Sequence, residues 1–124
     1  GNISAEKTVR TAGEPYAIRL VPDRDVLVAD GKDLAYVRVS IVDKDGNLCP
    51  HDGRMVEFEV SGAGSYRAAA NGDAASLDLF HLPRMHAFSG ELTAIVQSSP
   101  RKGNVSLKAK AEGLLSGEIN IKTN

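Results

Sequence analysis

The 124-residue sequence contains no tryptophan, one cysteine and no run of about 18 apolar residues. The lone Cys49 excludes an intrachain disulfide, so the fold must be stabilised by apolar burial whichever redox compartment it occupies. A transmembrane helix is excluded by the missing apolar run, and the amino terminus lacks the charged and apolar regions of a signal peptide. We therefore expect no membrane partner.

An excess of charge of one sign is also missing. The sequence has 15 Lys and Arg against 16 Asp and Glu, which gives a formal net charge of -1. No basic run is present that could follow a phosphate backbone, so we expect no nucleic-acid partner. A chain of this length can hide roughly two-thirds of its unfolded surface, which predicts one domain with one core.

The chain begins with Gly1 rather than Met, which we interpret as the start of a processed or excised fragment, with Gly1 a remnant of that excision. Residues 1–12 are mixed and polar, and we expect them to form a linker or an edge segment. Residues 13–124 are expected to form a single domain. Any targeting signal would then belong to a longer parent, so this fragment does not predict a localisation.

The clearest pattern in the sequence is a pair of alternating apolar and polar runs at residues 34–42 and 55–60. Between them lies a linker that opens with the turn-forming string at 43–47. The pattern predicts two packed β-strands. The side chains expected to point inward are Ala35, Val37, Val39, Ile41, Val56, Phe58 and Val60. Those expected to point outward are Tyr36, Arg38, Ser40, Met55, Glu57 and Glu59.

Other short alternating runs follow at intervals of about 8–12 residues, with turn residues between them. No amphipathic helical window is present, so the sequence predicts an all-β sandwich. Residues 80–90 show no clear period and are expected to form a long loop, where binding residues are often carried. The other expected strands are 16–21, 26–28, 91–98, 105–111, 119–121 and one starting at Leu77 and Leu79.

Two outward carboxylates, Glu57 and Glu59, are the strongest candidates for acid–base chemistry. Their spacing along one strand places them about 7 Å apart. An inverting glycosidase needs its two carboxyl groups about 6.5–9.5 Å apart, so the spacing is permissive. Nothing in the sequence predicts the burial that would raise the pKa of one above the other. We therefore expect both to lie on a solvated face.

Metal, nucleophile and phosphate sites are equally unsupported. Residues 43–47 resemble a calcium loop, but the glycine comes too early for an EF-hand, and a hairpin-type turn is favoured. His81, His86, His51 and Cys49 do not show zinc-ligand spacing. No nucleophile elbow is present, and the glycines at 62–64 precede a strand rather than a helix. We predict no catalytic, cofactor-binding or metal-binding residue in this chain, and no cofactor.

Sugar recognition usually needs exposed aromatic rings. The sequence has three Tyr and three Phe, and only Tyr36 and Tyr66 are candidates for an exposed sheet face. Two tyrosines on different strands make a weak platform, so direct sugar binding is not expected.

The order of several short motifs resembles the carboxy-terminal immunoglobulin-like domain of bacterial family 2 glycoside hydrolases of the β-galactosidase type. The resemblance extends from about Val9 to Lys122. The first half also resembles the immunoglobulin-like repeats of invasin-type adhesins. The motifs are TAGEP at 11–15, ADGKDLA at 29–35, DKDGN at 43–47, FEVSGAG at 58–64, NGD at 71–73, AFSG at 87–90 and AIVQS at 94–98.

This resemblance implies an immunoglobulin-like antiparallel β-sandwich that serves as a non-catalytic accessory module. In that family the catalytic glutamates lie in a separate (β/α)₈ barrel, which this chain is too short to contain. The implied partners are other domains of the parent enzyme, with residues 80–90 and 68–70 as the expected contact surface. A periplasmic or exported parent is implied as well. A carbohydrate-binding module and an adhesin repeat remain the alternatives.

Overall fold

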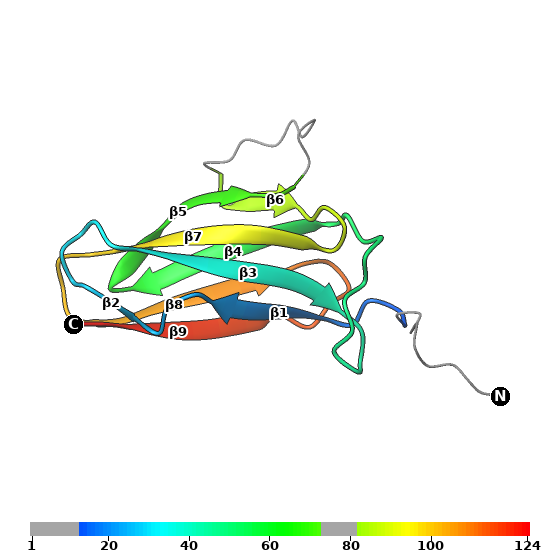
Figure 1. The fold of residues 1–124 in the computed structure, drawn as a ribbon, viewed down its shortest axis with the longest axis horizontal. Helices are drawn as coiled ribbons and strands as arrows, with labels where there is room; N and C mark the ends of the chain where they lie inside the picture. The colour runs from blue at the N-terminus through cyan, green and yellow to red at the C-terminus, as the bar shows by residue number, and fades with distance from the viewer. Residues whose placement is uncertain (1–12, 73–81) are drawn as a thin grey trace.

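The computed structural model describes residues 13–72 and 82–124, and within them the chain forms two packed β-sheets and no helix (Figure 1). The expected linker at 1–12 and the strand start at Leu77 and Leu79 lie outside the described residues. The strands are β1 Ala17–Pro22, β2 Val26–Leu27, β3 Leu34–Val42, β4 Met55–Gly62, β5 Gly64–Ala70, β6 Arg84–His86, β7 Glu91–Ser98, β8 Gly103–Lys110 and β9 Gly117–Thr123.

The four-stranded sheet, which we call sheet A, has the order β1-β3-β7-β5, and the five-stranded sheet B has the order β2-β9-β8-β4-β6. Neighbouring strands are antiparallel except β2 and β9, which run parallel. The predicted all-β sandwich is confirmed. The side chains buried between the sheets include Leu27, Ile41, Val56, Leu107 and Ile121, all fully covered.

The predicted alternation of β3 and β4 is confirmed at most positions, but Ser40 departs from it and Met55, predicted to point outward, is half-buried. Ala35, Val37, Val39 and Ile41 have no exposed surface, and Val56 and Phe58 are buried as well, while Val60 is half-buried. Ser40 was predicted to point to solvent but is only 1% exposed. Its partners in register are Arg19 on β1 and Glu91 on β7, and its hydroxyl donates to Glu91 Oε2 at 3.4 Å, so the small side chain lies between two longer ones.

The two strands predicted to pack together are not hydrogen-bonded neighbours. β3 belongs to sheet A and β4 to sheet B, so β3 passes in front of β4 in Figure 1 in the other layer. The turn at 43–47 instead returns the chain to β3, where Leu48 bridges Val42 and the Cys49 N–H donates to the Ile41 oxygen at 2.9 Å. Alternation predicts which face is buried but does not identify the hydrogen-bonded neighbour.

The loop predicted at residues 80–90 contains regular structure in its described part. Arg84–His86 forms β6, which pairs with β4 and buries Met85. A tight turn then joins Phe88 to Glu91 through two backbone hydrogen bonds, with positive φ at Ser89 (54°) and Gly90 (81°). A three-residue strand is too short to show a period in the sequence, so this element was missed.

The chain changes sheets between β4 and β5 through a single residue, Ala63. Gly62 has a φ of 86°, and a Cβ atom there would collide with the Asn104 carbonyl oxygen. Only glycine combines this left-handed backbone with so close an approach to β8.

Candidate functional site

The two candidate carboxylates lie on the outer face of sheet B and are exposed, as predicted. Glu59 Oε2 lies 3.1 Å from Lys110 Nζ. In register, Glu57 lies opposite Lys110 and Glu59 opposite Lys108. Each carboxylate thus lies opposite a lysine on a solvent-exposed face, without the buried, apolar surroundings in which a catalytic carboxyl group is usually held.

The acidic turn at 43–47 uses its first carboxylate to hold the backbone. Asp43 is 5% exposed and accepts hydrogen bonds from the N–H groups of Gly13 at 2.8 Å and of Asp45 and Asn47 at 2.9 Å. These donors lower the pKa of Asp43 to about 2, with the Gly13 N–H as the largest cause. The carboxylate is occupied by donors that hold the turn, which matches the predicted hairpin-type turn.

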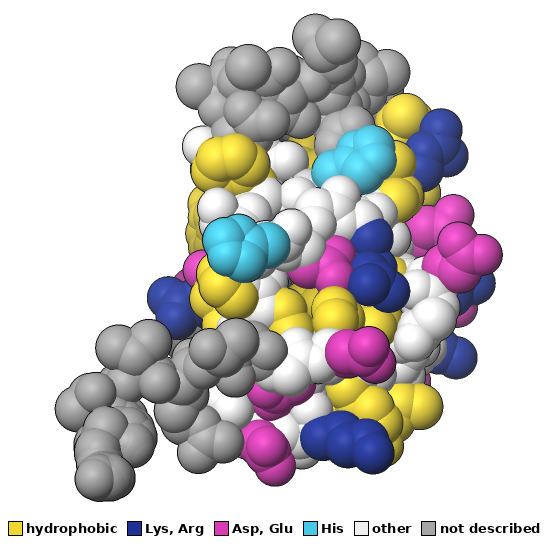
Figure 2. Space-filling view, turned by 90° about the vertical axis from the view of Figure 1, so that its right-hand side faces the viewer, with side chains coloured by type: hydrophobic (Ala, Val, Ile, Leu, Met, Phe, Trp, Pro, Cys, Tyr) yellow, Lys and Arg dark blue, Asp and Glu magenta, His cyan; other side chains and the backbone are white. Residues whose placement is uncertain are grey.

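The side chains that were considered and rejected as metal ligands do not come together among the described residues. His51 and His86 are exposed and form separate patches at one end of the molecule (Figure 2), and His81 lies outside the described residues. Cys49 is buried, and burial raises the pKa of its thiol. In residues 13–72 and 82–124 no group of three or more His, Cys, Asp and Glu side chains could hold a metal ion.

Of the two tyrosines considered for sugar stacking, one is unsuitable. Tyr66 was considered as an exposed ring, but it is half-buried and stacks on Phe58, with ring centroids 6.0 Å apart. Its hydroxyl donates to the Leu82 oxygen at 2.6 Å. Tyr36 remains exposed on sheet A, which leaves a single ring and no platform from this pair.

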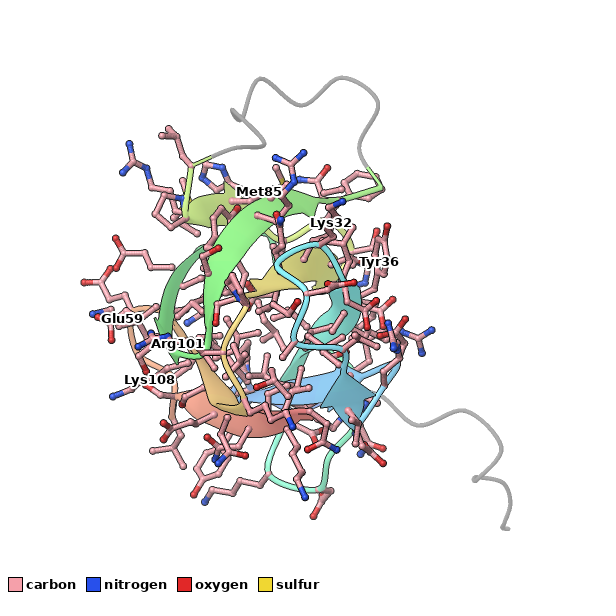
Figure 3. The ribbon with its side chains drawn as sticks, turned by 90° about the vertical axis from the view of Figure 1, so that its left-hand side faces the viewer. Lys32, Tyr36, Glu59, Met85, Arg101 and Lys108 are labelled. Carbon is pink, nitrogen blue, oxygen red and sulfur yellow. The ribbon has the colours of Figure 1, made fainter. Side chains whose placement is uncertain are left out.

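The outer faces of the two sheets differ in character. On sheet B, outward side chains of β4, β8 and β9 place opposite charges beside one another, with Glu118 opposite Lys108 and Lys108 opposite Glu59. Figure 3, viewed along the strands, shows Glu59 and Lys108 on one flank and Tyr36 on the opposite flank. The alternating charges on the outer face of sheet B are typical of a solvent-exposed surface.

The outer face of sheet A carries one charged row, formed by Arg19, Ser40 and Glu91, and beside it two rows that are mostly uncharged. We call the side chains of these two rows the sheet A face. Val21 is 49% exposed and Tyr36 is 47% exposed. The first row is Val21, Arg38, Thr93 and Ala70, and the second is Tyr36, Ile95 and Ala68.

A shallow hollow of about 460 Å³ lies at the edge of this face. Residues 68–70 and 80–90 were predicted as contact surface, and one residue of each, Ala70 and Phe88, lines this hollow. Phe88 is 45% exposed, and Gly72 lies beside its ring. The remaining lining residues are Arg38, Asn71, Ser89, Glu91, Leu92 and Thr93.

Ala68–Ala70 was expected from the sequence to be part of a contact surface, but the β7 half of the sheet A face was not expected. A signal was present, since Thr93 and Ile95 occupy the outward positions of a strand whose inward positions are Leu92, Ala94 and Val96. β-Branched side chains such as these at outward positions make the outer face of a strand less polar.

Comparison with known proteins gives the family. The model for the glycoside hydrolase family 2 C-terminal domain 5 matches residues 18–120. A β-galactosidase of Bacteroides ovatus, BoGH2A, is 40% identical over 98% of this chain, and the chain spans 14% of that relative's length. A solved family 2 glycosyl hydrolase of Bacteroides cellulosilyticus matches 91% of this chain and 15% of its own with a TM-score of 0.89 and 28% identity.

A fragment of intimin also has this fold, with a TM-score of 0.58, 13% identity, and coverage of 90% of this chain and 33% of the fragment. That likeness concerns the fold alone and lends no support to the adhesin alternative. Because the family model covers residues 18–120, the chain belongs to the C-terminal domain 5 family of glycoside hydrolase family 2.

Proposed function

We propose that this chain is a non-catalytic, domain-packing module of a larger family 2 glycoside hydrolase of the β-galactosidase type. The observation that carries the proposal is the contrast between the two outer faces. Sheet B presents cross-strand charge pairs such as Glu59 and Lys110, whereas the sheet A face presents Val21, Tyr36 and Ile95. Several exposed apolar side chains gathered on one sheet face, with few charges among them, are typical of a face that another protein surface covers.

The non-catalytic role is supported by the surroundings of the carboxylates. Glu57 and Glu59 are exposed and lie opposite lysines, so neither is held in the apolar pocket that is typical of a catalytic carboxyl group. The relative from Bacteroides ovatus is a β-galactosidase, and this chain corresponds to 14% of it. We therefore place the hydrolytic chemistry in other parts of the parent.

The test compares two lysine substitutions in the full-length parent enzyme. Ile95→Lys puts a charge in the middle of the sheet A face, and Asn120→Lys puts the same charge on the outer face of sheet B. If the sheet A face is covered, Ile95→Lys strands an ammonium in the interface, which is strongly unfavourable. It should lower the midpoint of thermal unfolding and speed proteolysis next to the domain, whereas Asn120→Lys should not.

The same two substitutions in the 124-residue chain alone provide the control. Ile95 points outward from sheet A, so its replacement should leave the unfolding of the isolated chain nearly unchanged. Equal behaviour of both variants in the full-length enzyme would refute the proposal.

A further inference from the structure

One cation interrupts the sheet A face. Arg38 is exposed and lies in register between Val21 on β1 and Thr93 on β7. Within residues 13–72 and 82–124 no carboxylate forms an ion pair with it. The other charged side chains of sheet A lie in other rows, so Arg38 is a single positive charge in a row of uncharged neighbours.

Glu91 lines the same hollow as Arg38 but is directed to another partner. The Ser40 hydroxyl donates to Glu91 Oε2 at 3.4 Å, and Ser40 is the register partner of Glu91 across β3 and β7. Arg38 pairs in register with Thr93, two residues further along β7. The guanidinium therefore keeps its hydrogen-bond donors for water or for an incoming group.

Covering this face would remove that water. A buried charge without a partner is strongly destabilising, and a guanidinium matches a carboxylate through two parallel hydrogen bonds. The surface that covers Arg38 must therefore supply an acceptor, and the exposed Phe88 ring beside the hollow requires apolar contact around it.

We propose that the Arg38 hollow receives a carboxylate from a neighbouring domain of the same enzyme, set among apolar side chains that cover Phe88 and Tyr36. This inference rests on the proposed function and names the chemistry of the partner surface. Arg38 is a positioning residue that fixes the register of the two domains, because a paired charge tolerates little sliding.

Zero-length cross-linking tests the proposal in the full-length enzyme. The substitution Arg38→Lys introduces an amine that carbodiimide can join to a carboxylate in direct contact. We expect mass spectrometry to find an amide between position 38 and an Asp or Glu of the parent outside these 124 residues. The natural pair of Lys110 and Glu59, whose charged atoms lie 3.1 Å apart, is the internal control for the reaction.

If the control amide forms and position 38 is joined only to Glu91, to a second copy of this domain, or to nothing, the proposal is overturned. The wild-type enzyme, in which position 38 carries no amine, should show no cross-link there.

Hydrogen exchange separates this inference from the proposed function. In the full-length enzyme, Arg38→Met should raise the exchange rate of the interface about thirtyfold or more, as expected for removing one partner of a buried charge pair. Glu91→Gln should leave it unchanged, and equal effects of the two would show that Glu91 is the partner. If Ile95→Lys raises exchange but Arg38→Met does not, the face is covered without a carboxylate, and if neither does, both proposals fail.

Discussion

Asp43 connects separate parts of the chain through one buried carboxylate. Its oxygens accept hydrogen bonds from the N–H of Gly13, where the described chain begins, and from the N–H of Asn47 across the turn. The Cys49 thiol contacts the Gly13 oxygen at 3.7 Å, so the segment that leads into β1 is held from two sides. The residue that resembled a calcium ligand in the sequence thus fixes the position at which the chain joins sheet A.

Acid should weaken the hydrogen bonds that Asp43 accepts, over a defined range of pH. The pKa of Asp43 is lowered from 3.8 to about 2, so its contribution to the free energy of unfolding is complete above about pH 4 and is lost as the pH falls through about 2. Asp43→Asn should be less stable at neutral pH and lose less stability on acidification. Urea unfolding at a series of pH values measures both effects.

The Asp33 carboxylate, whose pKa is also lowered to about 2 by Arg24 and backbone donors, will keep part of the acid dependence in that variant. Replacing both residues should therefore flatten the dependence further. An unchanged pH profile in Asp43→Asn would contradict the assignment.

The connection between β4 and β5, where the chain passes from one sheet to the other, has little room for side chains. Ala63 is buried, and its N–H donates to the Asn104 oxygen at 2.9 Å, so the connection is tied to the start of β8. Gly64 lies against Val105 and the Gln97 oxygen, where a Cβ atom would be 2.6 Å and 2.7 Å away. Any side chain here would push the two sheets apart.

Two alanine substitutions distinguish backbone strain from collision. Gly46 has a φ of 84°, and a Cβ atom there would meet only the Arg19 side chain at an ordinary contact distance of 3.9 Å, whereas Gly62 has a φ of 86° and the Asn104 backbone within collision distance. Gly46→Ala should cost about 1–2 kcal/mol for the left-handed backbone alone. Gly62→Ala should cost clearly more, measured as the free energy of unfolding in urea. Equal losses would show that β8 can move aside.

The strands could be predicted from the sequence to the extent that they are long and covered on one side. The strand predicted at 91–98 is β7 with the same bounds, and 34–42 is β3. β6 has three residues, and a period cannot be recognised over so few. The assignment of β3 and β4 to different sheets also escaped prediction, because both sheets bury the same kind of side chain.

Part of the candidate contact surface could also be predicted, because some of its residues are adjacent in the sequence. Residues 68–70 and 80–90 were expected to form the contact surface because they are apolar but irregular, and the structure places Ala70 and Phe88 at one hollow. The isolation of Arg38 could not be predicted, since it depends on Glu91 being hydrogen-bonded to Ser40 in a register that local sequence does not specify.

At the scale of the whole molecule, the core is closed by residues of both sheets within the described part of the chain. Ile41 from sheet A and Leu107 and Ile121 from sheet B are fully buried. We expect the 124-residue chain to unfold cooperatively by itself and to release no nitrophenol from nitrophenyl β-galactoside, with the full-length enzyme as the positive control. Turnover by the isolated chain would contradict its non-catalytic role.

β1 starts at one end of the long axis and β9 finishes at the other (Figure 1). β1 is joined to β3 by a ladder from Ala17 to Pro22, and the end of β9 is held by β2, where the Asn124 N–H donates to the Leu27 oxygen at 3.0 Å. Tension applied along this axis would load these ladders in shear, so their hydrogen bonds would have to break together rather than one after another. The sandwich would therefore resist extension along this axis until several backbone hydrogen bonds broke at once.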